Sequence, residues 1–329
     1  MIPAVIGLPG PALTAADRAL LGAYPPAGVI LFARNIETPD QLAALTAALR
    51  AVLPGDAHLM LDQEGGRVAR LRPPHWRAHP SAAAIGALWA AHPASARRAA
   101  WLQGALIGAE AAAAGCDIVT APVLDLAVPG ASDVIGDRAF GPDPDQVAAL
   151  GRAMADGLLA TGVIPVMKHL PGHGRARSDS HRDLPVVADP TEADLRPFAL
   201  NADLPWAMTA HILFPLWDPA RPATLSPAVL GGIIRRRIGF QGVLVTDDLA
   251  MGALTGPPAP NARAALAAGA DLALFCAGGT EATRAVLSAC PAMPPATQAR
   301  LVAARARAAA ARQPLDPDAL AAERDRLLA

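Results

Sequence analysis

The sequence predicts an α/β protein folded as a single (β/α)8 TIM-like barrel, and three observations support this prediction. Eight short apolar segments recur along the 329 residues. Ala- and Leu-rich segments with helical spacing lie between them. Polar residues gather where several apolar segments end, and in a barrel all of these ends open on one face. An open doubly wound sheet is the alternative, but no Gly-x-Gly-x-x-Gly motif follows the first predicted strand.

The eight predicted strands are mostly apolar on both faces, as strands of a buried parallel sheet are. In chain order they span residues 3–8, 28–32, 57–62, 116–122, 163–169, 205–211, 242–248 and 271–276.

Two of the intervening helices carry clear end signals. The segment 38–53 opens with Thr38, a residue that caps helix N-termini, and the segment 143–162 closes with Gly162, a residue common just past a C-terminus. No linker-like break interrupts the alternation. We therefore expect one catalytic domain over residues 1–329, with a C-terminal helical segment at about 291–329 packed on the barrel.

Composition narrows the class of partner. The formal net charge is −1 and no Lys/Arg run stands out, which argues against nucleic-acid or anionic-membrane partners. The N-terminus lacks the features of a signal peptide, and no apolar run has membrane-spanning length. Cys116, Cys276 and Cys290 are far apart, which favours free thiols in a reducing compartment. We expect a cytoplasmic monomer.

Polar residues follow at least five of the predicted strands. The third strand leads into "LDQEGGRVARLR" and the fourth into "APVLDL", and the fifth, sixth and seventh end in "MKH", "TAH" and "VTDD". Burying such groups is costly unless they are used, and active sites of barrels lie on this face. The pattern therefore indicates an enzyme.

Asp247 and Asp248 end the seventh predicted strand. Side chains alternate along a strand, so we expect only one of the two to point into the barrel. A partly buried carboxylate there can serve as nucleophile, base or metal ligand. The other Asp, and Asp248 is the better candidate, can instead cap the next helix.

The run "KHLPGHGRARSDSHRDLP" concentrates three of the eight histidines. Asp179 and His181 flank Ser180, and an Asp close to a His favours its protonated form and fixes its tautomer. Such a His can exchange protons near neutral pH. The alternative is an ordinary loop with a solvated His181.

Lys168 and His169 end the fifth predicted strand. A lysine there can form a Schiff base, as in some barrel aldolases, or hydrogen-bond a polyol. It can also simply extend to the barrel rim.

After the third strand, Asp62, Arg67 and Arg70 surround the pair Gly65–Gly66, which implies a tight turn. Arginine donors and a carboxylate acceptor suit a sugar, although Arg67 can equally form a structural salt bridge.

Arg138, in "IGDRAFGPDP", carries little information alone. His173, His181 and His211 lack the spacing of a metal-binding motif, so we expect neither a metal nor a cofactor.

Taken together, the motifs "LDQEGGRVARLR", "APVLDL", "IGDRAFGPDP", "KHLPGHG", "DSHRDLP" and "GVLVTDDLAM" resemble glycoside hydrolase family 3, from about residue 1 to 290. Within it, "KHLPGHG" followed by "DSH" is similar to the β-N-acetylglucosaminidases of bacterial cell-wall recycling. This resemblance implies a retaining exo-β-N-acetylglucosaminidase acting on muropeptides of the GlcNAc-1,6-anhydroMurNAc type.

The resemblance also implies roles for single residues. Asp247 matches the nucleophile that forms a covalent glycosyl-enzyme, His181 matches the general acid/base, and Asp179 matches the partner that orients it. The positions that match the sugar-binding residues are Asp62, Arg70, Arg138, Lys168 and His169.

Four other functions remain open from the sequence. They are a β-N-acetylglucosaminide phosphorylase, a broader family 3 β-glycosidase, a catalytically silent sugar-binding module and a Schiff-base aldolase using Lys168.

Overall fold

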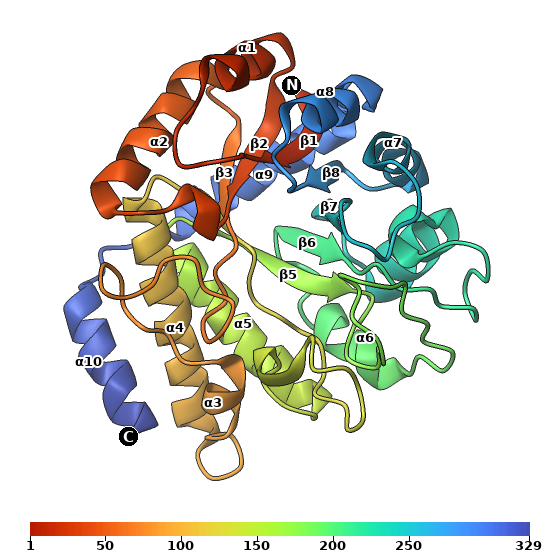
Figure 1. The fold of residues 1–329 in the computed structure, drawn as a ribbon. Helices are drawn as coiled ribbons and strands as arrows, with labels where there is room; N and C mark the ends of the chain where they lie inside the picture. Colours follow the sequence, from red (N-terminus) through yellow and green to blue (C-terminus); the bar gives the residue numbers. More distant parts are fainter.

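The structure, a computed structural model, describes all residues 1–329 and is a closed barrel of eight parallel strands (Figure 1). Each strand pairs with its neighbours in sequence order, and β8 pairs with β1 to close the sheet. The strands are β1 (Ile2–Gly7), β2 (Pro26–Leu31), β3 (His58–Leu61), β4 (Ile118–Val119), β5 (Ile164–Leu170), β6 (Trp206–Thr209), β7 (Val243–Asp248) and β8 (Leu272–Phe275). The predicted barrel is confirmed, and the open sheet is wrong.

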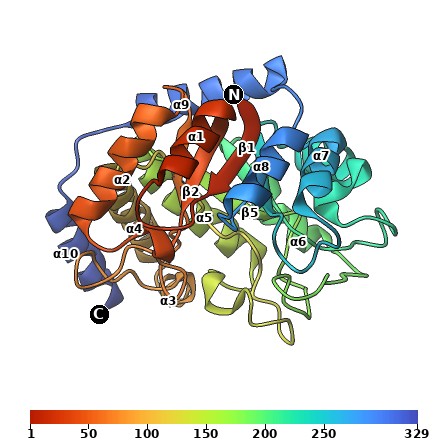
Figure 2. The same ribbon diagram turned by 45° about the horizontal axis from the view of Figure 1, so that its top comes forward.

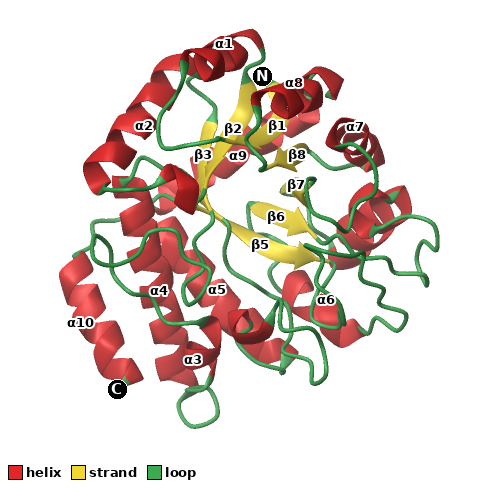
Figure 3. Ribbon diagram, in the orientation of Figure 1, coloured by secondary structure: helices red, strands yellow, loops and turns green.

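Helices surround the strands (Figure 3). They are α1 (Ala15–Ala23), α2 (Pro39–Val52), α3 (Ala82–Gly86), α4 (Pro93–Ala113), α5 (Pro144–Ala160), α6 (Glu192–Ala199), α7 (Pro258–Ala268), α8 (Thr280–Ala289), α9 (Pro295–Ala311), α10 (Pro317–Leu328) and a π-helical segment, η4 (Ala228–Ile238). Three short 3-10 turns are η1 (Ala33–Asn35), η2 (Gly136–Arg138) and η3 (Ala223–Leu225). No helix combines the length and apolar character that crossing a bilayer requires.

Both predicted helix ends are confirmed within two residues. The Thr38 hydroxyl accepts a hydrogen bond from the backbone N–H of Gln41 at 3.2 Å, so it caps α2. Gly162 has φ +83°, the left-handed conformation that lets the chain turn away from α5 without a Cβ clash.

Two apolar layers hold the barrel together. Inside it, Ile30, Met60 and Trp206 belong to a buried cluster that also includes Leu301 and Ala304 of α9. Figure 2 shows α9 lying across the end of the barrel at which the chain begins. A larger cluster of 54 buried residues includes the helix faces that pack on the strands. The barrel is thus closed at the N-terminal ends of its strands, and only the C-terminal ends of the strands are open to hold a site.

The last helix, α10, packs against α4 through a buried cation. Arg324 is 4 % exposed, and its Nη1 lies 3.1 Å from Nδ1 of His79. The other ring nitrogen of His79 lies 3.0 Å from Glu110 of α4. These contacts fix the C-terminal segment on the side of the barrel (Figure 1).

Candidate active site

A cavity of about 350 Å³ opens at the C-terminal ends of the strands. It collects side chains from β2 to β8 and the loops that follow them. Seven of the predicted site residues line it, namely Asp62, Arg70, Arg138, Lys168, His169, His181 and Asp247. Asp179 lies outside the lining and contacts His181 from behind.

Lys168 is held inside the barrel by two carboxylates. Its Nζ lies 2.5 Å from Glu64, 3.2 Å from Asp62 and 3.2 Å from the Thr120 hydroxyl, and its side chain is 4 % exposed. The alternative that Lys168 simply extends to the barrel rim is therefore wrong. Because these contacts engage the three N–H donors, the geometry favours a hydrogen-bonding ammonium over a Schiff-base amine.

Glu64 joins Lys168 to Arg138. Two parallel hydrogen bonds, Nε–Oε2 and Nη2–Oε1, link Arg138 to Glu64, and both are 2.8 Å long. Burial raises the pKa of Glu64, but the charges of Lys168 and Arg138 outweigh it and lower the pKa below its ordinary value. Glu64 was not among the predicted site residues, although its place between Asp62 and the Gly65–Gly66 turn is a usable signal.

Asp62 is the second buried anion of this group. It pairs with Arg70 and accepts a hydrogen bond of 2.5 Å from the Thr120 hydroxyl. Burial raises its pKa, yet the neighbouring charges of Lys168 and Arg70 lower it well below the usual range. Asp62 and Glu64 therefore stay ionised and can accept hydrogen bonds from hydroxyl groups.

Arg67 takes no part in this group. It pairs with Asp137 at 2.7 Å on the surface, where both side chains are nearly half exposed. The sequence left open whether Arg67 binds a sugar or forms a structural salt bridge, and the salt bridge is confirmed.

Asp125, from the "APVLDL" motif, organises the end of β5 from beneath. Its carboxylate lies 2.6 Å from His169 Nδ1 and accepts a 2.6 Å hydrogen bond from the His173 backbone N–H. The side chain is fully buried. Sequence reasoning noted this strand end but did not assign a role to Asp125.

His173 lines the cavity with a side chain that is almost fully buried. Burial lowers its pKa to about 4, and its Nε2 lies 3.0 Å from the Ser180 hydroxyl. His211 is also buried, between Thr224 and the backbone carbonyl of Asp248. The three histidines considered as metal ligands thus take part in separate hydrogen bonds.

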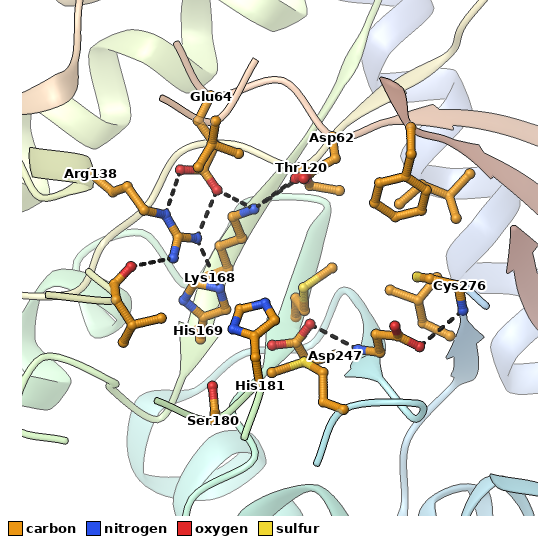
Figure 4. A pocket seen from close by; sticks show the side chains of 18 of the residues that line it. Asp62, Glu64, Thr120, Arg138, Lys168, His169, Ser180, His181, Asp247 and Cys276 are labelled. Carbon is orange, nitrogen blue, oxygen red and sulfur yellow. Dashed lines mark hydrogen bonds and ion pairs between the residues drawn. The ribbon is translucent and has the colours of Figure 1, made fainter. Parts of the chain in front are cut away.

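Asp247 lies within the cavity (Figure 4). Burial raises its pKa, but the charges of His169 and His211 and the backbone N–H of Asp248 together lower it. Asp247 is thereby kept ionised and is available to an electrophilic carbon.

Asp248 also lines the cavity, so the expectation that only one Asp faces inward is wrong. The register between β7 and β8 shifts between Val245 and Asp248, which breaks strict alternation. Asp248 accepts backbone hydrogen bonds from Ala250 at 3.0 Å and Cys276 at 2.9 Å. Asp248 therefore fixes the turn after β7, and the alternative that it caps the next helix is wrong, because α7 begins after Pro257.

The loop after β5 carries a hydrogen-bonded dyad. Nδ1 of His181 lies 2.8 Å from Asp179, and the two side chains are 62 % and 38 % exposed. Burial raises the pKa of Asp179, but hydrogen bonds from His181 outweigh burial and lower the pKa below its ordinary value. Asp179 is therefore an anion that fixes the ring and leaves Nε2 of His181 free.

Backbone hydrogen bonds bring this loop to the turn that follows Asp247. The carbonyls of Ser180 and His181 accept N–H groups of Ala253 and Gly252, both at 3.1 Å. A Cβ on Gly252 would lie 2.6 Å from the Arg182 carbonyl, so only glycine permits this approach. His181 and Asp247 consequently face one cavity, although 66 positions separate them (Figure 4).

Residues 5–309 match the family model described as the glycosyl hydrolase family 3 N-terminal domain. A beta-hexosaminidase from Alkalilimnicola ehrlichii is 41% identical over 310 residues, which cover 91% of this chain and 87% of that protein. A second, from Thiobacillus denitrificans, is 42% identical over 282 residues, or 83% of this chain and 78% of the relative. The crystal structure of NagZ from Neisseria gonorrhoeae in complex with N-trifluoroacetyl-D-glucosamine superposes with a TM-score of 0.87 at 32% identity, covering 99% and 98% of the two chains.

Proposed function

The chain belongs to glycoside hydrolase family 3 and is a glycoside hydrolase, and from this we propose that it is a retaining exo-β-N-acetylglucosaminidase. Its substrates are peptidoglycan-derived muropeptides of the GlcNAc-1,6-anhydroMurNAc type, from which it removes the terminal non-reducing N-acetylglucosamine. The observation that carries the proposal is the pairing, in one cavity, of the buried ionised Asp247 with the His181–Asp179 dyad.

In the first step, a carboxylate oxygen of Asp247 attacks the anomeric carbon. His181 Nε2 gives its proton to the glycosidic oxygen as that bond breaks, and Asp179 stabilises the imidazolium before transfer. In the second step, neutral His181 takes a proton from water, whose oxygen displaces Asp247. Two inversions restore the original anomeric configuration.

His181 suits the acid role because the neighbouring carboxylates are otherwise engaged. Asp62 and Glu64 are ion-paired and their pKa values are lowered, so neither donates a proton near neutral pH. Burial raises the pKa of Asp248, but this residue adjoins the nucleophile on the same strand and is held by two backbone N–H groups. In a retaining mechanism the acid and nucleophile flank the scissile bond.

The group formed by Asp62, Arg70, Arg138, Lys168 and His169 is proposed to bind the sugar hydroxyls. It offers carboxylate acceptors beside ammonium and guanidinium donors, and each hydroxyl needs both. The apolar barrel interior closes the cavity on the side of the strand N-termini. The end of a sugar chain therefore has to enter from the C-terminal face of the barrel, which supports exo action.

The phosphorylase alternative keeps one specific support. A neutral imidazole at His181 does not repel phosphate as a carboxylate does, and this side chain is mostly exposed. The expected activity is hydrolysis, and turnover that depends on phosphate and yields sugar-1-phosphate would establish phosphorolysis instead.

We also propose that the protein acts as a monomer in the cytoplasm, without cofactor. All three cysteines are free, and Cys116 and Cys276 are buried, which fits a reducing compartment. Cell fractionation and sedimentation of the purified protein test these two points.

The test of the proposed function is hydrolysis of N-acetylglucosaminyl-1,6-anhydro-N-acetylmuramic acid, followed by proton NMR. The expected first product is the β-anomer of N-acetylglucosamine, which then mutarotates. An α-anomer as first product would rule out double displacement. Cleavage of simple aryl β-glycosides but not of this disaccharide would place the chain among broader family 3 glycosidases.

A further inference from the structure

The loop between β3 and α3, residues 62–81, connects the cavity to the outside of the barrel. It supplies four side chains to the cavity lining, namely Asp62, Glu64, Val68 and Arg70. Further along the loop, the His79 carbonyl accepts a hydrogen bond of 2.9 Å from the Gly66 N–H. His79 therefore holds the turn that directly follows Glu64.

The turn at Gly65–Gly66 lies directly on the backbone of His79 and Pro80. A Cβ on Gly65 would lie 2.6 Å from the Pro80 carbonyl oxygen and 3.4 Å from Cβ of His79. It would also clash with Nε2 of Gln103, a residue of α4. Because no free space separates the turn from these groups, a displacement of His79 is passed on to Glu64.

The imidazole of His79 is fully buried between two helices. Its Nδ1 lies 3.1 Å from Nη1 of Arg324 in α10, and its Nε2 lies 3.0 Å from Glu110 in α4. Arginine has no acceptor, so Nδ1 accepts a hydrogen bond from Arg324 and Nε2 donates its proton to Glu110. Both partners are themselves buried, so removing either one leaves a ring nitrogen without a hydrogen bond.

Further contacts fix α10 in this place. Asp318, near the start of the helix, forms an ion pair with Arg77 of the same loop. At the end of the helix, Leu327 and Leu328 pack against the main apolar core. Figure 1 shows α10 alongside α4, on the outer side of the barrel. The last helix thus contacts the β3–α3 loop at Arg77 and His79 without lining the cavity.

Glu64 depends on its exact position because its carboxylate binds two cations at once (Figure 4). It pairs with Arg138 through two parallel hydrogen bonds of 2.8 Å, and its Oε1 lies 2.5 Å from Nζ of Lys168. A paired contact of this kind holds only while both oxygens lie opposite the guanidinium, so it depends on where the Glu64 backbone lies. Both cations line the cavity, so a shift of Glu64 displaces them as well.

We propose that α10 positions the charged groups of the cavity from outside the barrel. Arg324 holds the imidazole of His79, and His79 holds the Gly65–Gly66 turn. This turn keeps Glu64 in its two ion pairs. Arg324 and His79 are positioning residues, since neither lines the cavity. The alternative is that Arg324 only stabilises the fold, and the two roles differ in their effect on turnover by folded molecules.

The first test compares kcat/KM of full-length variants on nitrophenyl β-N-acetylglucosaminide, at a temperature where circular dichroism shows each of them fully folded. Arg324→Met removes the donor to His79, and kcat/KM should fall by about tenfold to a hundredfold, because small misplacements of site groups are costly. Arg324→Lys retains a donor and should recover part of this loss. Arg326→Met, the same change at an exposed arginine of the same helix, is the matched control and should keep the wild-type value.

A lower Tm of Arg324→Met with an unchanged kcat/KM would show that Arg324 only stabilises the fold, and would overturn the proposal. The second test needs no variant. It follows hydrogen exchange of the wild type in urea below the unfolding transition. The amides of α10 and of residues 64–80 should become exposed in one step with the same urea dependence, because the two segments are held together. Opening of α10 while residues 64–80 stay protected would contradict the proposal.

Failure of the proposed function and failure of this inference give different results. The activity test rests on the proposed function, because it needs a substrate that the wild type hydrolyses, whereas the exchange test needs no substrate. A wild type that is inactive on the β-N-acetylglucosaminide would refute the proposed function. Joint opening of α10 and residues 64–80 would still support the positioning role.

Discussion

Asp247 and His181 each depend on a neighbour for their chemical state. Asp247 is ionised because His169 and His211 face it, despite burial that favours the neutral acid. His181 is oriented by Asp179 at 2.8 Å. Asp247 lies in strand β7, which holds the nucleophile in place. His181 lies on the loop after β5, where the proton donor contacts a leaving group that varies from substrate to substrate.

The acid role of His181 predicts a dependence on the leaving group. His181→Ala should slow hydrolysis of the natural disaccharide far more than hydrolysis of aryl glycosides with good leaving groups, because these need little protonation. Steady-state rates across a series of aryl substrates measure the effect. Added azide should partly restore turnover, since it attacks the glycosyl-enzyme without needing a base. Equal losses for all leaving groups would remove His181 from the acid role.

The ion pairs around Lys168 predict how stability depends on pH. The pKa of Glu64 is lowered in the fold, so its contribution is fully present above its unfolded value of about 4 and is lost as pH falls further. Glu64→Gln should flatten that acid dependence. At neutral pH it should cost about 3–5 kcal/mol, because Lys168 and Arg138 remain buried without their carboxylate.

Urea unfolding of wild type and Glu64→Gln between pH 3 and 7 measures this effect. Asp137→Asn, which breaks only the exposed pair with Arg67, is the matched control and should cost about 0–1 kcal/mol. Identical pH slopes for wild type and Glu64→Gln would contradict the account of the ion pairs.

Residue-scale prediction succeeded where a side chain follows a strand directly and failed where its partner is distant in sequence. The cavity contains Asp62, Lys168, His169 and Asp247 as expected. The sequence did not predict a role for Asp125, because this residue acts through hydrogen bonds to residues more than 40 positions away. No local sequence pattern reveals such contacts.

At the element scale, strands were predictable because each is a short apolar run bounded by Gly, Pro or Asp. The alternation rule failed for Asp247 and Asp248, since the register shift at the end of β7 depends on pairing with β8. Similarly, the close contact between α4 and α5 is invisible in the sequence. It follows from the absence of a Cβ on Gly104, Gly108 and Gly157.

This contact gives a prediction for the helices. A Cβ on Gly157 would lie 2.1 Å from the Trp101 carbonyl oxygen, so Gly157→Ala should destabilise the fold by about 1–3 kcal/mol. Gly22→Ala in α1 has nothing within 4 Å and should stabilise by up to about 1 kcal/mol through helix propensity. Thermal unfolding of both variants and of the wild type measures these changes in stability. Stabilisation by Gly157→Ala would show that α4 and α5 are further apart than described.

At the scale of the whole molecule, closure of the barrel is what turns scattered motifs into a site. Residues from 30 to 277 meet at one end, while α9 closes the other. The repeated strand–helix pattern predicted the fold and the face that bears the site. The loop conformations over that face, which set the cavity's shape, depend on contacts such as Gly252 with His181 and were not predictable.

The central claim is that Asp247 forms a covalent bond to the sugar, and mass spectrometry of a trapped intermediate tests it most directly. In a 5-fluoro N-acetylglucosaminyl fluoride, the ring fluorine destabilises the oxocarbenium-like transition states and so slows both formation and hydrolysis of the glycosyl-enzyme. The anomeric fluoride is a good leaving group, so the glycosyl-enzyme still forms and then accumulates. The intact protein should gain the mass of one fluorosugar residue, and peptide mapping should place it on Asp247. Asp248→Asn should still be labelled, whereas Asp247→Asn should not. A label on another side chain, or none while the inhibitor is turned over with inversion, would contradict the account.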